Sequence, residues 1–475
     1  MAKEKKARYI VELDLILETF QFHVLEKRFE IGRKISNACK SKMLDHLRLL
    51  KQTQEYQYWL KQPKSKERSN QLTDLRERYD VSKTGAERIV KDMGKQFKQK
   101  KPKNPKHKQK IHLDSLVVQK IALAVWDSVS DYLFNSKTKK VHFKKFGQFD
   151  TIEGKNNESG LTYENGILYW NGLELKVYFP KKDQYLEKAM HDEIAYCRLI
   201  RKTIRGKVKY YLQLVMKGIP PQKREITEGE VGLDIGISTL AAVSDKEVMI
   251  EEFCEGLDML EKEKRMILRK MDRSRRASNP NKYNGDGTIK KGNKDKWIRS
   301  KRYWKLLFEL KEICRKLAAK RKFMHNHMAN KVLAMGNEIY CEKMNYKGLQ
   351  KTKFGKRIGY KAPSKFLTII NTKLSYQGKT LEYINTWKVK ASQYCPFSNQ
   401  YVKKKLSQRF HTTPEGFKIQ RDCFSAWLIK NVNKAKMEVN RQKCLKDFDS
   451  FYQAYKKTEE HLRSQNKTYI SSIGF

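Results

Sequence analysis

The order of hydrophobic and polar positions predicts one strand followed by helices in the first part of the chain. Residues 7–17 alternate apolar and polar side chains, as a strand with one buried face does, before an apolar end. The period then becomes that of amphipathic helices over residues 22–60, 71–94 and 113–135. A basic segment at 95–108 separates the last two, and its two prolines disfavour a helix there.

Between residues 140 and 220 the pattern is typical of short strands separated by turns rich in Gly and Asn. The strand-like segments are 143–150, 167–170, 173–179 and 209–215. We expect them to form a small β-barrel, which the strand at 7–17 completes. Aromatic residues among the lysines of these strands either stack on nucleobases or fill the barrel, and the sequence leaves both interpretations open.

After Pro220 and Pro221 the pattern predicts a mixed α/β region. Three short strands come first, then a long helical stretch broken near residue 278, and then strand, helix, strand and helix. The predicted strands are 231–236, 239–243, 248–253, 338–343 and 381–388, and the predicted helices are 303–335, 363–378 and one that begins at Asp422. This order is that of an RNase H-like fold, so the predicted class is a multidomain α/β protein.

The amino-acid composition indicates what kind of partner the protein binds. The 475 residues are enough for two to four domains, and 39% hydrophobic with 33% charged residues is typical of a globular chain. Lys and Arg total 102 against 53 Asp and Glu, which gives a net charge of +49. Because so large an excess repels itself, it favours a polyanionic partner, and we expect nucleic acid. Charge alone does not exclude a ribosomal or generally adhesive basic protein.

Several classes of site and location are disfavoured. The sequence opens without an apolar signal region and contains no run of about 18 apolar residues, so we expect a cytoplasmic, nucleoid-associated protein without a membrane partner. Its eight cysteines include no Cys-x-x-Cys pair, which indicates free core thiols and no zinc site. His325 and His327 do not share a helical face, and we expect them to face solvent or phosphate rather than a metal.

Three acidic residues have mostly apolar or basic neighbours in the sequence: Asp234, Glu342 and Asp422. Within the region after residue 220, Asp234 falls on the first predicted strand, Glu342 falls on the fourth, and Asp422 begins the last predicted helix. Two Mg²⁺ ions about 3.5–4 Å apart need a small set of shared carboxylates and open positions for water and phosphate. Each acid alone is more often a fold residue, but the combination in a strongly basic chain predicts a catalytic metal site.

The segments that carry these acids are similar to a known family. Segments 232–245, 340–349 and 420–426 resemble the three RuvC motifs of the TnpB family. Its members are transposon-encoded RNA-guided DNA nucleases related to compact type V CRISPR effectors. The resemblance is strong over about 226–435 and weaker upstream, where 143–147 and 169–173 look like the family's wedge-domain barrel.

The resemblance implies a division of the chain. It places the start of a wedge β-barrel at 1–24, an inserted helical recognition domain at 25–135, the rest of the barrel at 136–225 and a RuvC-like nuclease domain at 226–440, followed by a tail at 441–475. It further implies a bound guide RNA, a double-stranded DNA target and recognition of a short motif beside that target. Asp234, Glu342 and Asp422 are then the catalytic and metal-binding residues.

Six basic residues are candidates for nucleic-acid contact: Lys144, Lys145, Arg273, Arg275, Arg276 and Arg421. The two lysines belong to the first strand-like segment, where they contact RNA or are surface charges. The first three arginines precede a predicted loop at 278–293. There they either contact a guide–target duplex, gate the site, or form a solvated basic helix end.

Two departures from the family pattern bear on function. Members usually carry a four-cysteine zinc ribbon between the second and third motifs, whereas the region 388–420 here is degenerate, with only Cys395, His411 and Cys423 in or near it. We expect a metal-free hairpin or loop there. In the third motif, Phe424 and Ser425 replace the usual Asn and first Ala.

The leading hypothesis is an RNA-guided, Mg²⁺-dependent DNA endonuclease that cuts both strands with one RuvC site. In such an enzyme base pairing carries specificity and the protein holds the guide–target duplex by its backbone. A second hypothesis is an RNA-guided DNA-binding repressor with weak or lost cleavage. A third is a protein-only transposase of the same catalytic fold.

Overall fold

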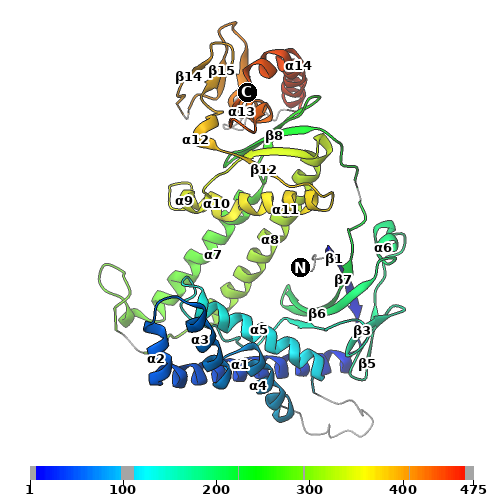
Figure 1. The fold of residues 1–475 in the computed structure, drawn as a ribbon, viewed down its shortest axis with the longest axis vertical. Helices are drawn as coiled ribbons and strands as arrows, with labels where there is room; N and C mark the ends of the chain where they lie inside the picture. The colour runs from blue at the N-terminus through cyan, green and yellow to red at the C-terminus, as the bar shows by residue number, and fades with distance from the viewer. Residues whose placement is uncertain (1–6, 98–111, 223, 293–294, 406, 466–475) are drawn as a thin grey trace. The chain divides into compact units, whose positions relative to one another are not determined.

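The structure is a computed structural model and describes residues 7–97, 112–222, 224–292, 295–405 and 407–465 (Figure 1). It divides into two compact units, Met1–Pro221 and Gln222–Phe475. Most of the basic segment predicted at 95–108 lies outside the described residues. The domain boundaries implied by the family resemblance stay predictions, because contacts alone separate only these two units.

Helices fill the sequence between the first two strands of the first unit. The helices are α1 (Thr19–Gln52), α2 (Gln54–Lys61), α3 (Lys66–Arg78), α4 (Lys83–Gln96) and α5 (Ser115–Phe134). Side chains of Ser65, Ser82 and Asp114 accept hydrogen bonds from backbone amides in the first turns of α3, α4 and α5. These caps satisfy amides that no helical carbonyl reaches, which is why the helices begin there.

A seven-stranded sheet forms the rest of the first unit, in the order β2-β6-β7-β1-β5-β4-β3. Its strands are β1 (Arg8–Ile16), β2 (Thr151–Glu153), β3 (Leu161–Glu164), β4 (Ile167–Trp170), β5 (Leu173–Val177), β6 (Ile194–Ile204) and β7 (Lys207–Lys217), and a short helix, α6 (Gln184–Ala189), precedes β6. The sheet is nearly closed, because β3 contacts β6 near the other end of the order. The predicted strand at 7–17 is confirmed as β1, which pairs with both β7 and β5.

The sequence prediction was wrong over 143–150, since the strand there begins only at Thr151. Residues 144 and 145 lie in a loop against α1, where the Asn37 side chain bonds both the amide and the carbonyl of Lys144. The backbone groups of Lys144 thus form hydrogen bonds with α1 and not with a neighbouring strand. Strand β6 was missed, because its apolar positions are interrupted by Arg and Lys.

The second unit is built on a five-stranded sheet with the order β10-β9-β8-β11-β12. Its strands are β8 (Glu230–Ile235), β9 (Thr239–Val243), β10 (Val248–Glu252), β11 (Glu338–Glu342) and β12 (Glu382–Ile384). The first three form an antiparallel meander, and β11 pairs in parallel with β8 and with β12. Along the chain, three strands, a long helical stretch, β11, further helices and β12 follow one another as the sequence pattern predicts.

Both faces of this sheet are covered. Leu240 and Ala242 belong to an apolar core with α8 (Lys301–Met335) and α11 (Pro363–Ser375), whereas Ala241 and Val243 belong to a core with α13 (Arg421–Lys430) and α14 (Arg441–Ser464). Alternate residues of one strand therefore face different helical layers. Burial on both faces explains why β9 is apolar at every position after Thr239.

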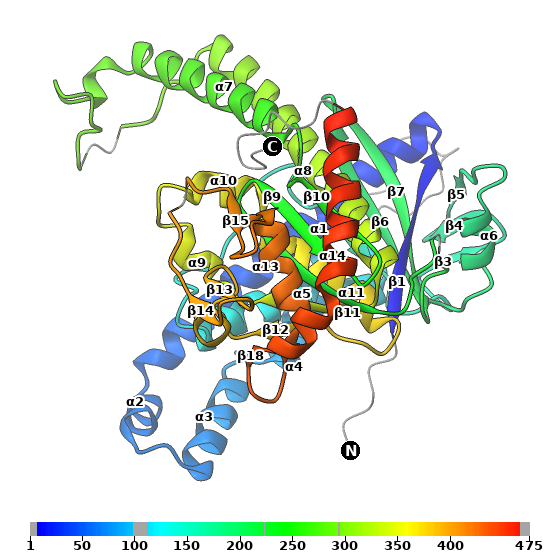
Figure 2. The ribbon, with the colours of Figure 1, turned by 90° about the horizontal axis from the view of Figure 1, so that it is seen from above.

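A helical hairpin connects the meander to β11. It consists of α7 (Leu257–Ala277) and α8, which lie side by side in both views (Figures 1 and 2). Ile267, Met271, Leu306 and Ile313 form the apolar contact between them. In the segment that connects the two helices, the Asn279 side chain donates hydrogen bonds to the carbonyls of Arg275 and Ile298. It also accepts one from the Ile298 amide.

Two expectations for the last part of the chain are corrected. The strand predicted at 381–388 ends at Ile384, because Asn385 caps a short helix, α12 (Thr386–Val389). The segment after 440 is not a tail, since residues 441–464 form α14. Its buried residues Cys444, Phe448, Phe451, Tyr455 and Leu462 recur at helical spacing and pack against α13 and the sheet.

Candidate functional site

Two of the three predicted acids stand side by side at the ends of parallel strands. Leu233 of β8 pairs with Cys341 of β11, so the next residues, Asp234 and Glu342, are neighbours across the ladder. Adjacent strands lie about 4.8 Å apart, and residues in register point to the same face. The sheet register therefore brings these two carboxylates together although 108 positions separate them in the sequence.

Helix α13 brings the third acid to the same face. It crosses β8 so closely that a Cβ at Gly232 would lie 1.9 Å from the Ala426 carbonyl oxygen. Asp234 stands two residues beyond Gly232 on the strand, and Asp422 stands one helical turn before Ala426. The glycine thus allows the contact that places Asp422 beside Asp234.

The start of α13 is held by its N-cap. The Gln420 side-chain oxygen accepts hydrogen bonds from the amides of Asp422 and Cys423, at 2.6 and 2.9 Å. The amide of Gln420 in turn donates to the Tyr455 hydroxyl of α14. Hydrogen bonds to the backbone therefore position Asp422, and α14, which the sequence predicts as a tail, supports it through Tyr455.

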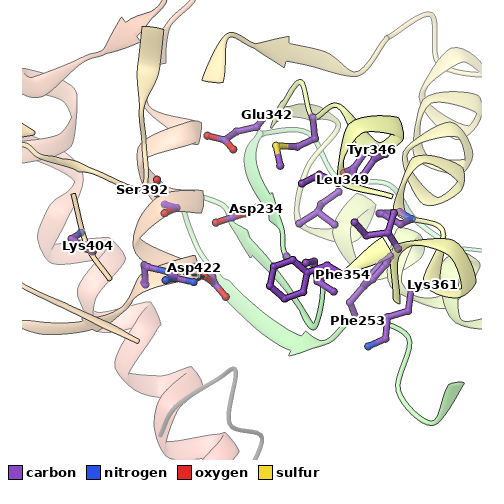
Figure 3. A pocket seen from close by; sticks show the side chains of 18 of the residues that line it. Asp234, Phe253, Glu342, Tyr346, Leu349, Phe354, Lys361, Ser392, Lys404 and Asp422 are labelled. Atoms are coloured by element: carbon purple, nitrogen blue, oxygen red, sulfur yellow. Dashed lines mark hydrogen bonds and ion pairs between the residues drawn. The ribbon is translucent and has the colours of Figure 1, made fainter. Parts of the chain in front are cut away.

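The three acids line one cavity of about 410 Å³ in the second unit (Figure 3). Asp234 and Glu342 come from the sheet, and Asp422 comes from α13. Arg421, Ser425, Lys403 and Lys404 belong to the same lining, together with apolar residues from the segment after β11. Of the sequence-predicted site residues, the structure brings Asp234, Glu342, Asp422 and Arg421 together here.

The negative charges of Asp234, Glu342 and Asp422 are only partly balanced by the nearby positive charge of Arg421. Burial raises the pKa of Asp234 well above its usual range, and the charges of Asp422 and Glu342 raise it further, while Arg421 opposes them. Burial also raises the pKa of the Glu342 carboxyl. Buried carboxylates that repel one another are the hard oxygen donors that a divalent cation such as Mg²⁺ stabilises.

Asp422 has protein partners in this arrangement. Thr239 donates its hydroxyl to one carboxylate oxygen at 2.7 Å, and Arg421 lies 3.4 Å from the other. Among the residues that the structure describes, no group of three or more His, Cys, Asp or Glu side chains is gathered closely enough to form a metal site. The three carboxylates have the oxygen donors of a Mg²⁺ site but lie farther apart than the ligands of one ion, and Thr239 and Arg421 orient Asp422.

A basic wall, formed by Arg421, Lys403 and Lys404, lies across the cavity from the segment after β11. The Lys404 ammonium is buried and has no hydrogen-bond partner among the described residues. Burial lowers the pKa of Lys404 to about 8. Sequence analysis missed this residue, because a lysine in a run of three lysines gives no signal of a buried amine.

The other basic candidates do not line the cavity. Lys144 and Lys145 belong to the first unit, and the Lys144 ammonium lies 4.8 Å from the ring centroid of Phe149. On α7, Arg275 and Arg276 both pair with Asp272, at 2.5 and 2.7 Å. Arg275 also lies over Trp297 and Arg276 over Tyr283, so both stabilise the end of the hairpin. Arg273, the next residue after Asp272, is exposed.

The expectation that His325 faces solvent or phosphate was wrong. Its ring is fully buried, stacks on Phe253 and places Nε2 2.8 Å from the Lys361 carbonyl oxygen. Burial lowers the pKa of His325 to about 4, so the ring is neutral and donates that bond. His327 stacks instead on Phe323.

Two small hairpins lie within residues 388–420. Strands β13 (Tyr394–Cys395) and β14 (Gln400–Tyr401) make the first, and β15 (Phe410–Thr412) and β16 (Lys418–Gln420) make the second. His411 of β15 stacks on Phe424 of α13, with ring centroids 4.1 Å apart. Phe424 is therefore a core residue, and the neighbouring Ser425 is the one that faces the cavity.

Comparisons with known proteins give coarse similarities only. No protein-family model and no curated protein sequence matches the chain. A solved structure described as a Cas12f1–sgRNA–target DNA complex is similar with a TM-score of 0.45 and 10% identity, over 90% of this chain and 99% of that chain. A second, described as a CRISPR–Cas12f ternary complex, has a TM-score of 0.28 and 14% identity, over 85% and 81% of the two chains. No described helix is long and apolar enough to span a bilayer.

Proposed function

We propose that this protein is an RNA-guided, Mg²⁺-dependent DNA endonuclease with an RNase H-like nuclease domain. The observation that carries the proposal is the meeting of Asp234, Glu342 and Asp422 at one cavity, from two strands and a helix of the fold. A net charge of +49 favours a nucleic-acid substrate for that site. Guidance by RNA rests on the similarity of the three acidic segments to the RuvC motifs of the TnpB family.

Asp234, Glu342 and Asp422 would hold the metal. Bound Mg²⁺ lowers the pKa of a coordinated water and stabilises charge on a phosphate. The protein's own contribution is orientation: Thr239 fixes one oxygen of Asp422, and the Gln420 cap fixes its backbone. Arg421 and the Lys404 ammonium would provide positive charge on the wall where phosphate oxygens would lie.

The RNA and DNA partners are part of the proposal. The two solved structures named above are described as complexes with guide RNA and target DNA or as a ternary complex. For this chain we infer a guide RNA whose pairing with one DNA strand selects the target, and a short flanking motif read in duplex DNA. The single site would then cut the displaced strand and the target strand in turn.

The test begins with RNA that co-purifies with the protein expressed beside its native flanking DNA. A single structured RNA with a constant part and a guide-like end supports guidance and defines a DNA target. That target is then incubated with Mg²⁺ and either the native protein or Asp234→Ala. Cleavage by the native protein alone, with equal binding by both, supports the endonuclease; no enriched RNA contradicts guidance.

A repressor without cleavage remains the second candidate. The observation that favours it is the spacing of the acids, because no described group of three or more His, Cys, Asp or Glu side chains lies closely enough to hold a metal ion. If the native protein and Asp234→Ala both bind the target and neither cuts it at any Mg²⁺ concentration, the repressor is correct.

A further inference from the structure

Lys404 brings a buried amine to the cavity that the three acids line. Its side chain belongs to the lining, but its Nζ atom is covered and has no hydrogen-bond partner among the described residues. Lys403 and Lys405, its neighbours in the chain, are exposed. Because burial of an unpaired charge is costly, burial favours the neutral amine at Lys404 and not at its two neighbours.

The neutral form of Lys404 is a nucleophile. An ammonium has no free electron pair, whereas a neutral amine has one. Burial lowers the pKa of Lys404 to about 8, and the charge of Arg421 contributes to this. Roughly a tenth of the Lys404 side chains are then neutral at pH 7, against about one in 2,500 for a lysine in water. The cavity therefore contains a reactive nitrogen that hydrolysis of a phosphodiester does not use as a nucleophile.

Two hydrogen-bond donors lie near this amine. The Lys404 Nζ atom is 5.4 Å from the centroid of the Phe424 ring, and His411 stacks on the same ring with the centroids 4.1 Å apart. Burial lowers the pKa of His411 to about 4, so the imidazole is neutral, and its buried Nε2 also lacks a partner among the described residues. With the proton on Nε2, His411 is a donor. Arg421, whose guanidinium only donates, lines the same cavity and is close enough for its charge to act on Lys404.

These surroundings limit the electrophile that can react with Lys404. Its Nζ atom is covered, so the reagent has to be small, and the Phe424 ring makes part of that cover apolar. The product has to accept hydrogen bonds, because Arg421 and His411 offer donors. Carbon dioxide meets each condition, since it is an apolar molecule of three atoms and its adduct with an amine is an anionic carbamate.

We propose that Lys404 is a site of reversible carbamylation by carbon dioxide. The bond between Nζ and carbon forms while one carbon–oxygen double bond of CO₂ becomes a carboxylate, and Nζ releases one proton to solvent. The carbamate accepts hydrogen bonds from Arg421 and from Nε2 of His411. The side chain then carries one negative charge where the ammonium carried one positive charge.

Carbamylation reverses one charge of the basic wall, and its effect on activity rests on the proposed nuclease function. A negative group near Arg421 repels the phosphate that this wall is proposed to hold, so carbon dioxide inhibits cleavage. The modification itself does not depend on that function, because it needs only the amine and its two donors.

Labelling of the native protein with ¹³C-bicarbonate tests the modification. The carbamate is trapped by O-ethylation with triethyloxonium, and the labelled residue is located by tandem mass spectrometry. We expect label at Lys404 and at least about tenfold less at Lys403 and Lys405, because an exposed lysine is almost fully protonated at pH 7. If Lys404 carries no more label than these two neighbours, the proposal is overturned, and a bound water or inorganic anion accounts for the buried amine.

Two variants test the donors. His411→Phe keeps an aromatic ring against Phe424 and removes the N–H group, and Arg421→Met removes the guanidinium. Each should lower the label at Lys404 about tenfold at a fixed bicarbonate concentration, the effect of losing one hydrogen bond to an anion. Unchanged label in both variants overturns the assignment of these donors.

A cleavage assay separates the modification from the proposed function. Native protein with its co-purified RNA, Mg²⁺ and target DNA is assayed at constant pH and ionic strength, with bicarbonate in place of chloride. We expect cleavage to fall at least about tenfold as Lys404 becomes labelled, whereas Lys404→Met should keep its own lower rate and also reports any loss of Mg²⁺ to carbonate. Label at Lys404 with unchanged cleavage overturns the inhibition. Label in a protein that cuts no DNA supports the modification and contradicts the nuclease.

Discussion

Replacing Lys404 by methionine should stabilise the second unit and weaken its activity. The buried ammonium has no hydrogen-bond partner among the described residues and lies 5.4 Å from the Phe424 ring centroid, and its pKa is lowered from 10.5 to about 8. At 1.36 kcal/mol for each tenfold change in protonation equilibrium, that difference corresponds to about 3 kcal/mol of preference for the neutral amine. Partial exposure of the side chain reduces the effect, and we expect Lys404→Met to raise the free energy of unfolding by about 1–3 kcal/mol near pH 7.

The pH dependence follows from the direction of the shift. The folded state binds fewer protons than the unfolded state between about pH 8 and 10.5, so the native protein gains stability as pH rises through that range. Methionine has no charge to bury. Its advantage over lysine should therefore be complete below about pH 8 and shrink by roughly 1–2 kcal/mol near pH 9.5.

Pulse proteolysis in urea, with fragments of the second unit quantified, measures this free energy for both proteins. Lys403→Met is the matched control, because its side chain is exposed and lines the same cavity. It should leave stability unchanged within about 0.5 kcal/mol. DNA cleavage by Lys404→Met should fall about tenfold through the loss of a positive charge near the phosphate. Equal stability of Lys404→Met and the native protein, or a difference that does not vary with pH, would refute the reasoning.

Three further substitutions test how the site is supported. Asp447→Ala removes a carboxylate that lies 2.8 Å from the buried Lys430 ammonium and accepts hydrogen bonds from Trp427 and Asn431. Because Asp245 still pairs with Lys430, the main loss is that of two buried donors' acceptor, and the second unit should be destabilised by about 2–4 kcal/mol in urea unfolding. Thr239→Val removes the hydroxyl that donates to Asp422, and should raise the Mg²⁺ concentration needed for half-maximal cleavage about 10- to 100-fold. Gly232→Ala places a Cβ against the backbone of α13, and should destabilise the unit by about 3 kcal/mol or more and abolish cleavage.

Each of these substitutions has a matched control. Asp449→Ala removes an exposed acid of the same helix and should change stability by less than about 0.5 kcal/mol. Thr239→Ser keeps the hydroxyl and should restore most of the Mg²⁺ affinity. Gly285→Ala meets no atom within 4 Å and should be neutral. If Thr239→Val and Thr239→Ser require the same Mg²⁺ concentration, the hydroxyl does not orient Asp422.

The hydrophobic periodicity of the sequence was sufficient to predict the strands and the helix that carry the three acids. β8, β11 and the start of α13 were all predictable, because apolar runs bounded by Gly and polar residues predict buried strands, and Asp422 before a run of apolar residues predicts a helix start. Segment 143–150 could not be predicted in the same way. Its backbone groups are satisfied by Asn37, a partner about a hundred residues away that local pattern does not reveal.

By itself the sequence determined the basic charge, the order of strands and helices in the second unit, and three acids on distinct elements. Those properties depend on residue type and on neighbours within a few positions. Tertiary structure alone decided that Asp234 and Glu342 share a register, that Gly232 lets α13 approach, and that Lys404 is buried beside them. Such features arise from packing between segments far apart in the chain, and no local period records how closely two distant backbones approach or which amine is removed from water.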